Sequence, residues 1–425
     1  LSPLGDRVAY VQTSIDENKT YRSHLFVQSI QEDRSLALTG GNVRDSFPRW
    51  SPDGKTICFL SNRSGQSQIW LISADGGEAR QLTACKHGAR NPVWSPDGKH
   101  LLFSALLAPG ETFSQREADA DAQTEKKRKQ PMVVERLKYK SDDLGFPEGK
   151  TQQLAIFDVV TGEISPLTHG DYDHSVGNWS PDGQWIAFTA NRADEPDITP
   201  VSDLYLISVK DREWKKLTDG TGVFSQPTWS PDGNKIAMVG SPTDRFYGVQ
   251  KKIWVHDVET GEQRCLTDKW DIHFSDVVLG DMRSPGHPLP GALWTPDGEG
   301  MYAIASENGN SSLYLITLGG ELTSVVAGER HLFGVTMDSQ RQSAVLAVSD
   351  PVQPGDLFFV SLANQEERKI TSVNQELLEE LELSAPEEIR YEGPDSWTIQ
   401  GWLMKPVGYQ CGEKYPMILQ IHGGP

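Results

Sequence analysis

The sequence predicts an all-β fold, a seven-bladed β-propeller, followed by the first strands of a truncated α/β domain. Two recurring markers predict the propeller. Trp-Ser-Pro-Asp-Gly begins at Trp50, Trp94, Trp179 and Trp229, and Trp-Thr-Pro-Asp-Gly begins at Trp294. The second marker is a Leu-Thr or Ile-Thr pair that ends at Thr39, Thr83, Thr168, Thr218, Thr267 and Thr371. Degenerate copies of the first marker at residues 1–11 and 336–348, and of the second marker near Val326, bring both counts to seven. Internal repeats of this kind are typical of propellers.

Each repeat contains the signals for four short strands. The Ser-Pro-Asp-Gly segment predicts a turn, because Pro presets φ, Asp offers a side-chain acceptor and Gly accepts positive φ. In the second repeat, residues 55–61, 68–73 and 78–83 are apolar or alternating runs between turn residues. With the strand that ends at the tryptophan, the unit has four strands. A four-stranded sheet buries its faces only against neighbours, which favours a propeller, whereas a β-sandwich would not keep such regular spacing.

Two repeats carry insertions. The third repeat is extended by a charged block within residues 111–130, for which a solvated loop or short helix is the default expectation. The other insertion lies between Thr267 and Trp294 and contains Asp271, His273, Asp276, Arg283 and His287 without the spacing of metal ligands. Because strands in a blade alternate in direction, both insertions are expected at one mouth of the propeller, opposite the Ser-Pro-Asp-Gly turns. We take that mouth as the predicted functional face, although such loops are often decoration.

Composition excludes several classes of protein. Lys and Arg number 40 against 59 Asp and Glu, and the net charge of −19 argues against nucleic acid and anionic lipid as partners. No apolar stretch approaches the roughly 20 residues that span a bilayer. The cysteines have neither metal nor disulfide-framework spacing, so free thiols and a cytoplasmic location are expected; they are Cys58, Cys85, Cys265 and Cys411. The chain begins inside a repeat at Leu1, which leaves a signal peptide upstream open.

The pattern changes after Thr371. We place the propeller at residues 1–372, truncated at its N-terminal end in the first blade, a linker at 373–385, and the start of a second domain at 386–425. Residues 374–383 have helical spacing, with Asn374 as the expected cap. Residues 387–406 predict a strand, a turn and a strand, and residues 415–421 predict a buried strand leading into His422-Gly423-Gly424-Pro425.

A glycine-rich loop after an early strand is a mark of α/β-hydrolases, in which a backbone N–H faces the developing oxyanion. With the repeats, the segments Gly401–Pro406, Lys414–Pro425 and Glu135–Phe146 give the whole chain a resemblance to the prolyl oligopeptidase family of serine peptidases, in its acylaminoacyl-peptidase-like bacterial branch. The resemblance implies a propeller over a C-terminal α/β-hydrolase domain with a Ser-His-Asp triad. It also implies that the propeller excludes large folded substrates.

The resemblance places the backbone N–H of Gly424 in the oxyanion hole, with Gly423 shaping the loop. The triad Ser, Asp and His are expected beyond Pro425, so this chain alone is expected to be inactive. His422 precedes the nucleophile, whereas the triad order in this fold is Ser, Asp, His, so a structural role for His422 is favoured. Arg136 and Tyr139 in the third-blade insertion are candidates to face substrate, although packing is the commoner role of such residues. The aspartates of the Ser-Pro-Asp-Gly turns are assigned to turn chemistry.

We therefore expect part of a serine peptidase that cleaves short peptides without a cofactor or metal, with homo-oligomerisation left open. The alternative from another class is a non-catalytic propeller that binds peptides or proteins. A third alternative is a dipeptidyl-peptidase specificity, which needs acidic residues at the mouth to hold a free substrate amine. Glu195 and Asp197 are candidates for that role, but no sequence feature selects them.

Overall fold

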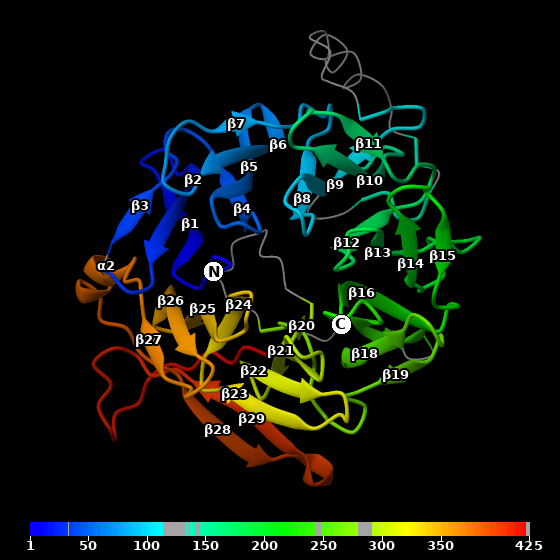
Figure 1. Cartoon of the computed structure of the whole chain (residues 1–425). Helices are drawn as coiled ribbons and strands as arrows, with labels where there is room; N and C mark the ends of the chain where they lie inside the picture. Colours follow the sequence, from blue (N-terminus) through cyan, green and yellow to red (C-terminus); the bar gives the residue numbers. More distant parts are fainter. Residues whose placement is uncertain are drawn as a thin grey trace.

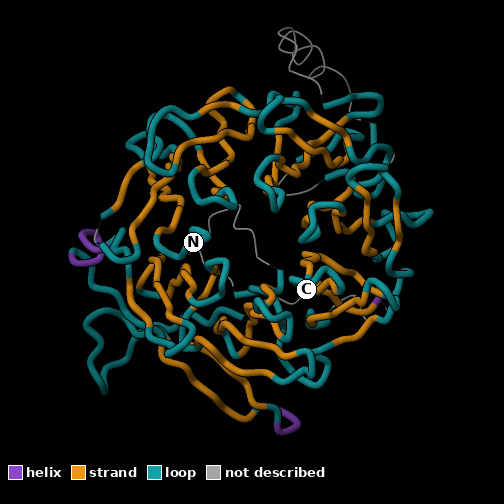
Figure 2. The backbone as a smooth tube through the Cα atoms, in the orientation of Figure 1, coloured by secondary structure: helices purple, strands orange, loops and turns teal. Residues whose placement is uncertain are grey.

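The computed structural model describes residues 1–32, 34–113, 133–134, 136–140, 145–243, 248–278 and 291–421. Its strands form seven blades arranged in a ring, plus one separate hairpin (Figure 1). Figure 2 shows that loops and strands make up nearly all of the described backbone. Every sheet is built from antiparallel neighbours in chain order, as expected for a propeller.

The blades follow one another along the chain. Blade 1 has β1 (Arg7–Ile15), β2 (Tyr21–Ser29) and β3 (Ser35–Ala37); blade 2 has β4 (Asp45–Trp50), β5 (Thr56–Ser64), β6 (Gln66–Ser73) and β7 (Arg80–Gln81). Blade 3 has β8 (Ala89–Trp94), β9 (His100–Leu107), β10 (Thr151–Asp158) and β11 (Ile164–Pro166); blade 4 has β12 (His174–Trp179), β13 (Trp185–Ala190), β14 (Asp203–Ser208) and β15 (Trp214–Lys216). Blade 5 has β16 (Gly222–Trp229), β17 (Lys235–Pro242), β18 (Lys252–Asp257) and β19 (Gln263–Cys265). Blade 6 has β20 (Leu293–Trp294), β21 (Gly300–Glu307), β22 (Asn310–Thr317) and β23 (Leu322–Val326); blade 7 has β24 (His331–Met337), β25 (Ser343–Asp350), β26 (Gln353–Ser361) and β27 (Glu367–Lys369).

The hydrophobic core lies between the blades. Among the described residues, seven buried clusters each join side chains of two adjacent sheets. One cluster packs Leu102 and Ile156 of blade 3 against Phe188 of blade 4, and another packs Val8 of blade 1 against Val345 of blade 7. Each blade therefore buries its faces only against its neighbours, and the ring closes between the first and last blades.

The Ser-Pro-Asp-Gly turns form as the sequence predicts. Ser51 Oγ donates to Asp53 Oδ1 at 2.6 Å, and Asp53 Oδ1 also accepts the Lys55 N–H at 3.1 Å. Gly54 has φ of +69°, a conformation that suits glycine. The same Ser–Asp hydrogen bond recurs at Ser230 and Asp232, at 2.5 Å. The repeated aspartates are thus turn residues, as expected.

The threonine of the second marker has a structural role that the sequence did not reveal. In six blades its hydroxyl accepts a backbone N–H from the next-to-last strand of the same blade, as in the 2.9 Å bond from Ile69 N to Thr83 Oγ1. In blade 2 the hydroxyl also donates to a side chain on that strand, since Thr83 bonds Gln68 Oε1 at 2.9 Å. The threonine thereby fixes the end of the outer strand.

The tryptophan marker links neighbouring blades. Trp94 Nε1 donates to Arg49 O at 3.1 Å, and Trp179 Nε1 donates to Val93 O at 3.2 Å. Equivalent bonds join Trp229 to Asn178 O and Trp294 to Thr228 O. In each case the acceptor is the residue before the tryptophan position of the preceding blade. These bonds form a ladder that links blades 2 to 6 in succession, whereas the indole nitrogen of Trp50 has no hydrogen-bond partner among the described residues.

The inner strands contain irregularities that the sequence did not predict. Register shifts interrupt the pairing of β4, β8, β12, β16 and β24 with their neighbours. At three of these sites a non-glycine residue has positive φ: Phe47 at 61°, Asn91 at 52° and Gln226 at 54°. Such β-bulges bend the strand and increase its local twist.

The C-terminal region differs from the sequence prediction at two points. The helix α2 spans only Gln375–Glu379, and Asn374 makes no side-chain capping hydrogen bond. Residues 415–421 form no strand, and most of their side chains are exposed. A strand needs a neighbour for its backbone groups, and the described chain supplies none there. The hairpin is as predicted, with β28 (Glu387–Glu392), a 3₁₀ turn at Pro394–Ser396 and β29 (Thr398–Leu403).

Candidate functional site

The predicted oxyanion loop lies outside the described residues. The predictions for His422, Gly423, Gly424 and Pro425 therefore have no structural counterpart here. The segment that leads to them carries apolar side chains on the surface: Ile418 is 94% exposed and Ile421 is 80% exposed. Apolar side chains grouped in this way mark a surface that another polypeptide covers.

The hairpin before this segment is attached to blade 6. Gln400 Nε2 donates to Asn308 O, in the loop between β21 and β22, at 3.0 Å. Trp402 packs so closely there that a Cβ on Gly309 would lie 2.4 Å from its Cζ2 atom. Figure 1 shows β28 and β29 beside β22 and β23 at the rim of the ring. The hairpin thus docks on the face that carries the loops between second and third strands.

The third-blade insertion reaches the same face. Arg136 Nη2 donates to Asp197 Oδ1 at 2.7 Å, in the loop between β13 and β14 of blade 4. Asp197 Oδ2 also accepts the N–H of Leu137 at 2.9 Å. These contacts hold the strap, defined here as residues 136–140, against blade 4. The expectation that the insertion crowds this mouth agrees with the contact.

The structure brings together two candidates that the sequence treated separately. Asp197, considered as an anchor for a substrate amine, is neutralised by Arg136, whose hydrogen bond holds the pKa of that carboxyl below its usual range. Glu195 is exposed and its carboxylate has no partner among the described residues. Tyr139 stacks on Phe146 with a ring-centroid distance of 6.3 Å, which is a packing role.

A small pocket opens between the strap and blade 4. Its volume is about 200 Å³, and its polar lining comes from the strap, the connection into β12 and the β13–β14 loop. The lining residues that carry polar groups are Arg136, Lys138, Tyr172, Asp173, Ser175, Asn191 and Ser202. Sequence analysis missed Tyr172, Asp173, Ser175 and Ser202, because only the fold brings them beside the strap.

Side chains next to this pocket are held rigidly. The Arg192 guanidinium lies 4.9 Å from the ring centroids of both Tyr172 and Trp214. It also contacts His174 Nε2 at 3.2 Å. Burial, with the nearby Arg192 charge, lowers the pKa of His174 to about 4, so this imidazole is neutral at physiological pH. An aromatic and cationic cluster therefore lies beside the pocket, and Tyr172 is the member of it that lines the pocket.

The second insertion contributes a buried histidine–carboxylate pair. Asp276 Oδ1 lies 2.9 Å from His331 Nε2, and both side chains are buried. The Val277 N–H donates to Ser306 Oγ at 3.1 Å, which ties this connection to blade 6. His273 pairs with Ser306 through the backbone. Arg283 and His287 lie outside the described residues, and no group of three potential metal ligands occurs in the described ranges.

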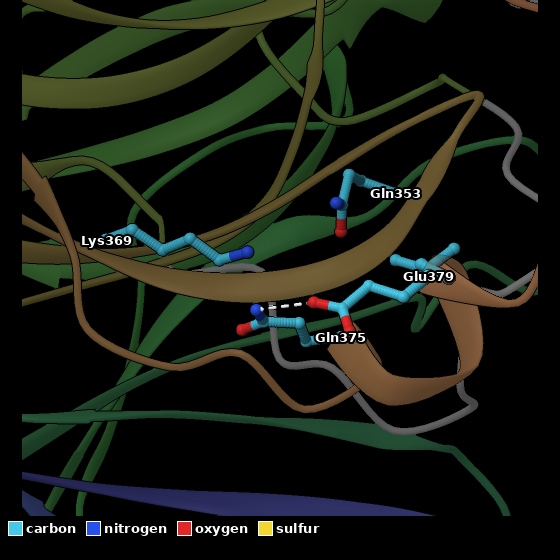
Figure 3. Close-up of a pocket in the computed structure, with 5 residues that line it drawn as sticks. Gln353, Lys369, Gln375 and Glu379 are labelled. Atoms are coloured by element: carbon cyan, nitrogen blue, oxygen red, sulfur yellow. Dashed lines mark hydrogen bonds between the residues drawn. The ribbon is translucent and has the colours of Figure 1, made fainter.

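A larger cavity of about 400 Å³ lies beside α2. Figure 3 shows Gln375 donating to Glu379 within this space, at 2.9 Å. Lys369 is already paired with Asp356 at 2.9 Å. These polar groups are engaged with the protein itself, so the cavity gives no sign of a ligand. No helix in the described part of the chain is long and apolar enough to cross a membrane.

The chain is similar to peptidases along its whole length. A family model described as the TolB beta propeller domain matches residues 1–131. The chain is 35% identical to an uncharacterized peptidase, YuxL, of Bacillus subtilis over 100% of this chain and 64% of the relative. It is 26% identical to dipeptidyl-peptidase 5 of Porphyromonas gingivalis, over 100% of this chain and 61% of the relative. The chain thus spans less than two thirds of these relatives.

Solved structures share the fold. Pyrococcus horikoshii acylaminoacyl peptidase superposes with a TM-score of 0.73 at 22% identity, over 97% of this chain and 57% of that one. The β-propeller domain of the trilobed protease from Pyrococcus furiosus gives a TM-score of 0.58 at 19% identity, over 87% of this chain and 96% of that one. The chain is thus similar along its whole length to a relative named as a peptidase, and it shares its propeller fold with solved peptidases.

Proposed function

We propose that this chain is the propeller, with the start of the catalytic domain, of a serine peptidase that hydrolyses short peptides. The observation that carries the proposal is the match of the entire chain, including the hairpin and the segment that leads to His422-Gly423-Gly424-Pro425, to a peptidase. The HGGP segment is what distinguishes a hydrolase from a propeller that only binds peptides. The cytoplasmic location, the absence of a cofactor and any self-association stay predictions.

In the proposed reaction, a serine hydroxyl attacks the peptide carbonyl while a histidine takes its proton and an aspartate orients the histidine. The proton returns to the leaving amine, and water then releases the acyl group by the reverse sequence. The backbone N–H of Gly424 stabilises the oxyanion of each tetrahedral intermediate. A donor of this kind contributes roughly a hundredfold to a thousandfold in rate.

The exposed apolar segment supports the proposed second domain. Met417, Ile418 and Leu419 are consecutive and 79%, 94% and 73% exposed. Burying each of them would stabilise the protein by about 1.5–3 kcal/mol. We propose that residues 415–421 become a central strand of the catalytic sheet, which would cover them on both faces. That role accounts for an apolar run in a segment that has no strand partner in the described chain.

The proposal is tested with a fluorophosphonate probe, which labels only an activated serine. The complete gene product is expected to be labelled and to hydrolyse peptide esters, whereas residues 1–425 alone are expected to do neither. Full-length protein boiled before labelling is the control for non-specific reaction. An unlabelled, folded gene product that still binds peptides would replace the proposal with the non-catalytic alternative.

A further inference from the structure

The strap forms one wall of the small pocket at blade 4. Arg136 and Lys138 line the pocket from the strap, and the other lining residues come from blade 4 and the connection that leads into it. The enclosed volume is about 200 Å³. If the strap moved away, the pocket would become an open groove on blade 4. The contacts that hold the strap therefore decide access to this space.

Every hydrogen bond of the strap within the described part of the chain goes to the β13–β14 loop. Asp197 Oδ1 accepts Arg136 Nη2 at 2.7 Å, and Asp197 Oδ2 accepts the Leu137 N–H at 2.9 Å. Lys138 Nζ donates to the Pro196 carbonyl at 2.7 Å. The strap belongs to the insertion of blade 3, yet its hydrogen bonds fasten it to blade 4, chiefly through one carboxylate.

Burial of apolar side chains does little to hold the strap. Leu137 is 71% exposed and Tyr139 is 49% exposed. The ring partner of Tyr139 is Phe146, which is itself 45% exposed. The hydrophobic effect scales with the apolar area removed from water, so its contribution to the closed position is small. The polar contacts to Asp197 and Pro196 dominate.

The blade 4 side of this contact keeps its shape without the strap. Asn191 Nδ2 donates to the Pro196 and Thr199 carbonyls at 3.1 Å and 2.8 Å, and the Thr199 N–H donates to the Glu195 carbonyl at 3.0 Å. These bonds lie within the β13–β14 loop. The side chain of Asp197 is only 15% exposed. The loop thus presents a fixed carboxylate, and the strap is the part that can move.

A second ion pair of the propeller shows what a permanent one looks like. In blade 2, Arg63 Nη2 contacts both oxygens of Asp45, which is fully buried, and the Arg63 guanidinium lies 4.9 Å from the ring centroid of Trp70. Arg136 is 43% exposed and has no ring contact among the described residues. Its bond to Asp197 is charge-assisted and strong, but water reaches it. The strap pair can therefore open without disturbing the core.

We propose that the strap is a lid over this pocket and that the carboxylate of Asp197 is the latch that keeps the lid shut. Loss of the negative charge on Asp197, or competition for its donors by an anionic solute, opens the lid and exposes the blade 4 lining to the mouth. The inference goes beyond the proposed peptidase function and does not depend on it, because every contact that carries it lies within the propeller.

Hydrogen exchange of the Leu137 N–H in the complete gene product tests the latch, with residue-level resolution by mass spectrometry. This amide is expected to be protected in the wild type. Asp197→Asn is expected to speed its exchange at least roughly tenfold, equivalent to about 1.4 kcal/mol in the opening equilibrium. Glu195→Gln is the matched control, because it removes an exposed carboxylate of the same loop that has no partner among the described residues. It is expected to leave the exchange rate unchanged.

Thiol labelling tests the lid. Ser202 lines the pocket, so Ser202→Cys places a thiol behind the strap. Its reaction with iodoacetamide is expected to be roughly tenfold faster when Asp197→Asn is added, because labelling tracks the population of the open form. Cys411 is exposed and should react at the same rate in both proteins, as an internal control. Circular dichroism checks that each variant is folded.

Three results would overturn the inference. They are an unprotected Leu137 N–H in the wild type, exchange that Asp197→Asn does not change or that Glu195→Gln speeds equally, and faster exchange without faster labelling. The last result would show a contact that does not control access to the pocket. A gene product that has the latch and the lid but does not react with fluorophosphonate would overturn the peptidase proposal alone.

Discussion

At the scale of single residues, most of the repeated side chains bond to the backbone of another element. The indoles of Trp94, Trp179, Trp229 and Trp294 reach the preceding blade, and the threonine hydroxyls reach the next-to-last strand of their own blade. The sequence predicted both markers as repeats. It could not predict the bonds, because an indole donor has no partner preference that spacing along one chain reveals.

The indole ladder predicts a specific loss of stability. Trp179→Phe keeps an aromatic ring but removes the donor to Val93 O and leaves that carbonyl without its partner. The cost is expected to be about 1–2 kcal/mol, measured as a lower urea midpoint. Trp185→Phe is the matched control, because the Trp185 ring lies 4.4 Å from Lys215 Nζ and its indole nitrogen makes no bond to the described residues. Equal losses in both variants would refute the role of the ladder.

The turn aspartates predict a dependence of stability on pH. The hydrogen bond from Ser230 holds the pKa of Asp232 below its usual range, and Ser51 does the same for Asp53. A carboxyl with a lowered folded-state pKa stabilises the fold above its unfolded pKa, about 3.9, and this contribution is lost as pH falls through the folded value.

Asp232→Asn should therefore lower stability at pH 7 and flatten the fall in stability between about pH 5 and pH 2. Thermal melts across that range measure the effect. Asp219→Asn, at an exposed carboxylate without a hydrogen bond to the described residues, is the control. A wild-type slope that is unchanged in Asp232→Asn would show that the turn carboxylate is not linked to folding.

At the scale of elements, alternation and turn residues were sufficient to predict the strands and the C-terminal hairpin. They were insufficient for three features. The bulges depend on how inner strands twist around the axis, which no local pattern encodes. The helix α2 stops after Glu379, since Glu376 and Glu380 are like charges four positions apart and none of its residues is buried. Residues 415–421 are apolar enough for a strand but have no strand beside them.

The bulge in β12 predicts that glycine is required at one position. A Cβ on Gly177 would lie 1.5 Å from the carbonyl oxygen of Ala187, at the register shift between β12 and β13. Gly177→Ala is expected to cost about 3 kcal/mol or more, because backbone must move. Gly40→Ala is the control, since a Cβ on Gly40 would have no atom within 4 Å. A Gly177→Ala melt that matches wild type would contradict the close approach.

At the scale of the whole molecule, counting the repeats was enough to predict seven blades. The side-chain contacts at the mouth of the propeller could not be predicted, because they join residues that are far apart in sequence. Arg136 and Asp197 are 61 positions apart, and Asp173, which lines the same pocket, lies on neither insertion. The predicted oxyanion loop at Gly423 and Gly424 stays a prediction.

The ring also predicts selection by substrate size. If the propeller and its strap limit access, kcat/KM of the complete gene product should stay high for short peptides and fall steeply for folded proteins. Arg136→Ala frees the strap from Asp197 and should relax that limit, with little change for the shortest peptides. The length series is measured with peptides of common sequence at the cleavage site. Efficient cleavage of a folded protein by the wild type would rule out the size limit.

The central claim is that this propeller serves a serine peptidase, and the gene downstream of the Pro425 codon tests it most directly. Sequencing that region is expected to reveal an open reading frame with Gly-x-Ser-x-Gly, followed by an aspartate and then a histidine, in the order of α/β-hydrolases. A stop codon directly after Pro425, or a nucleophile elbow without its serine, would contradict the claim and favour a peptide-binding propeller.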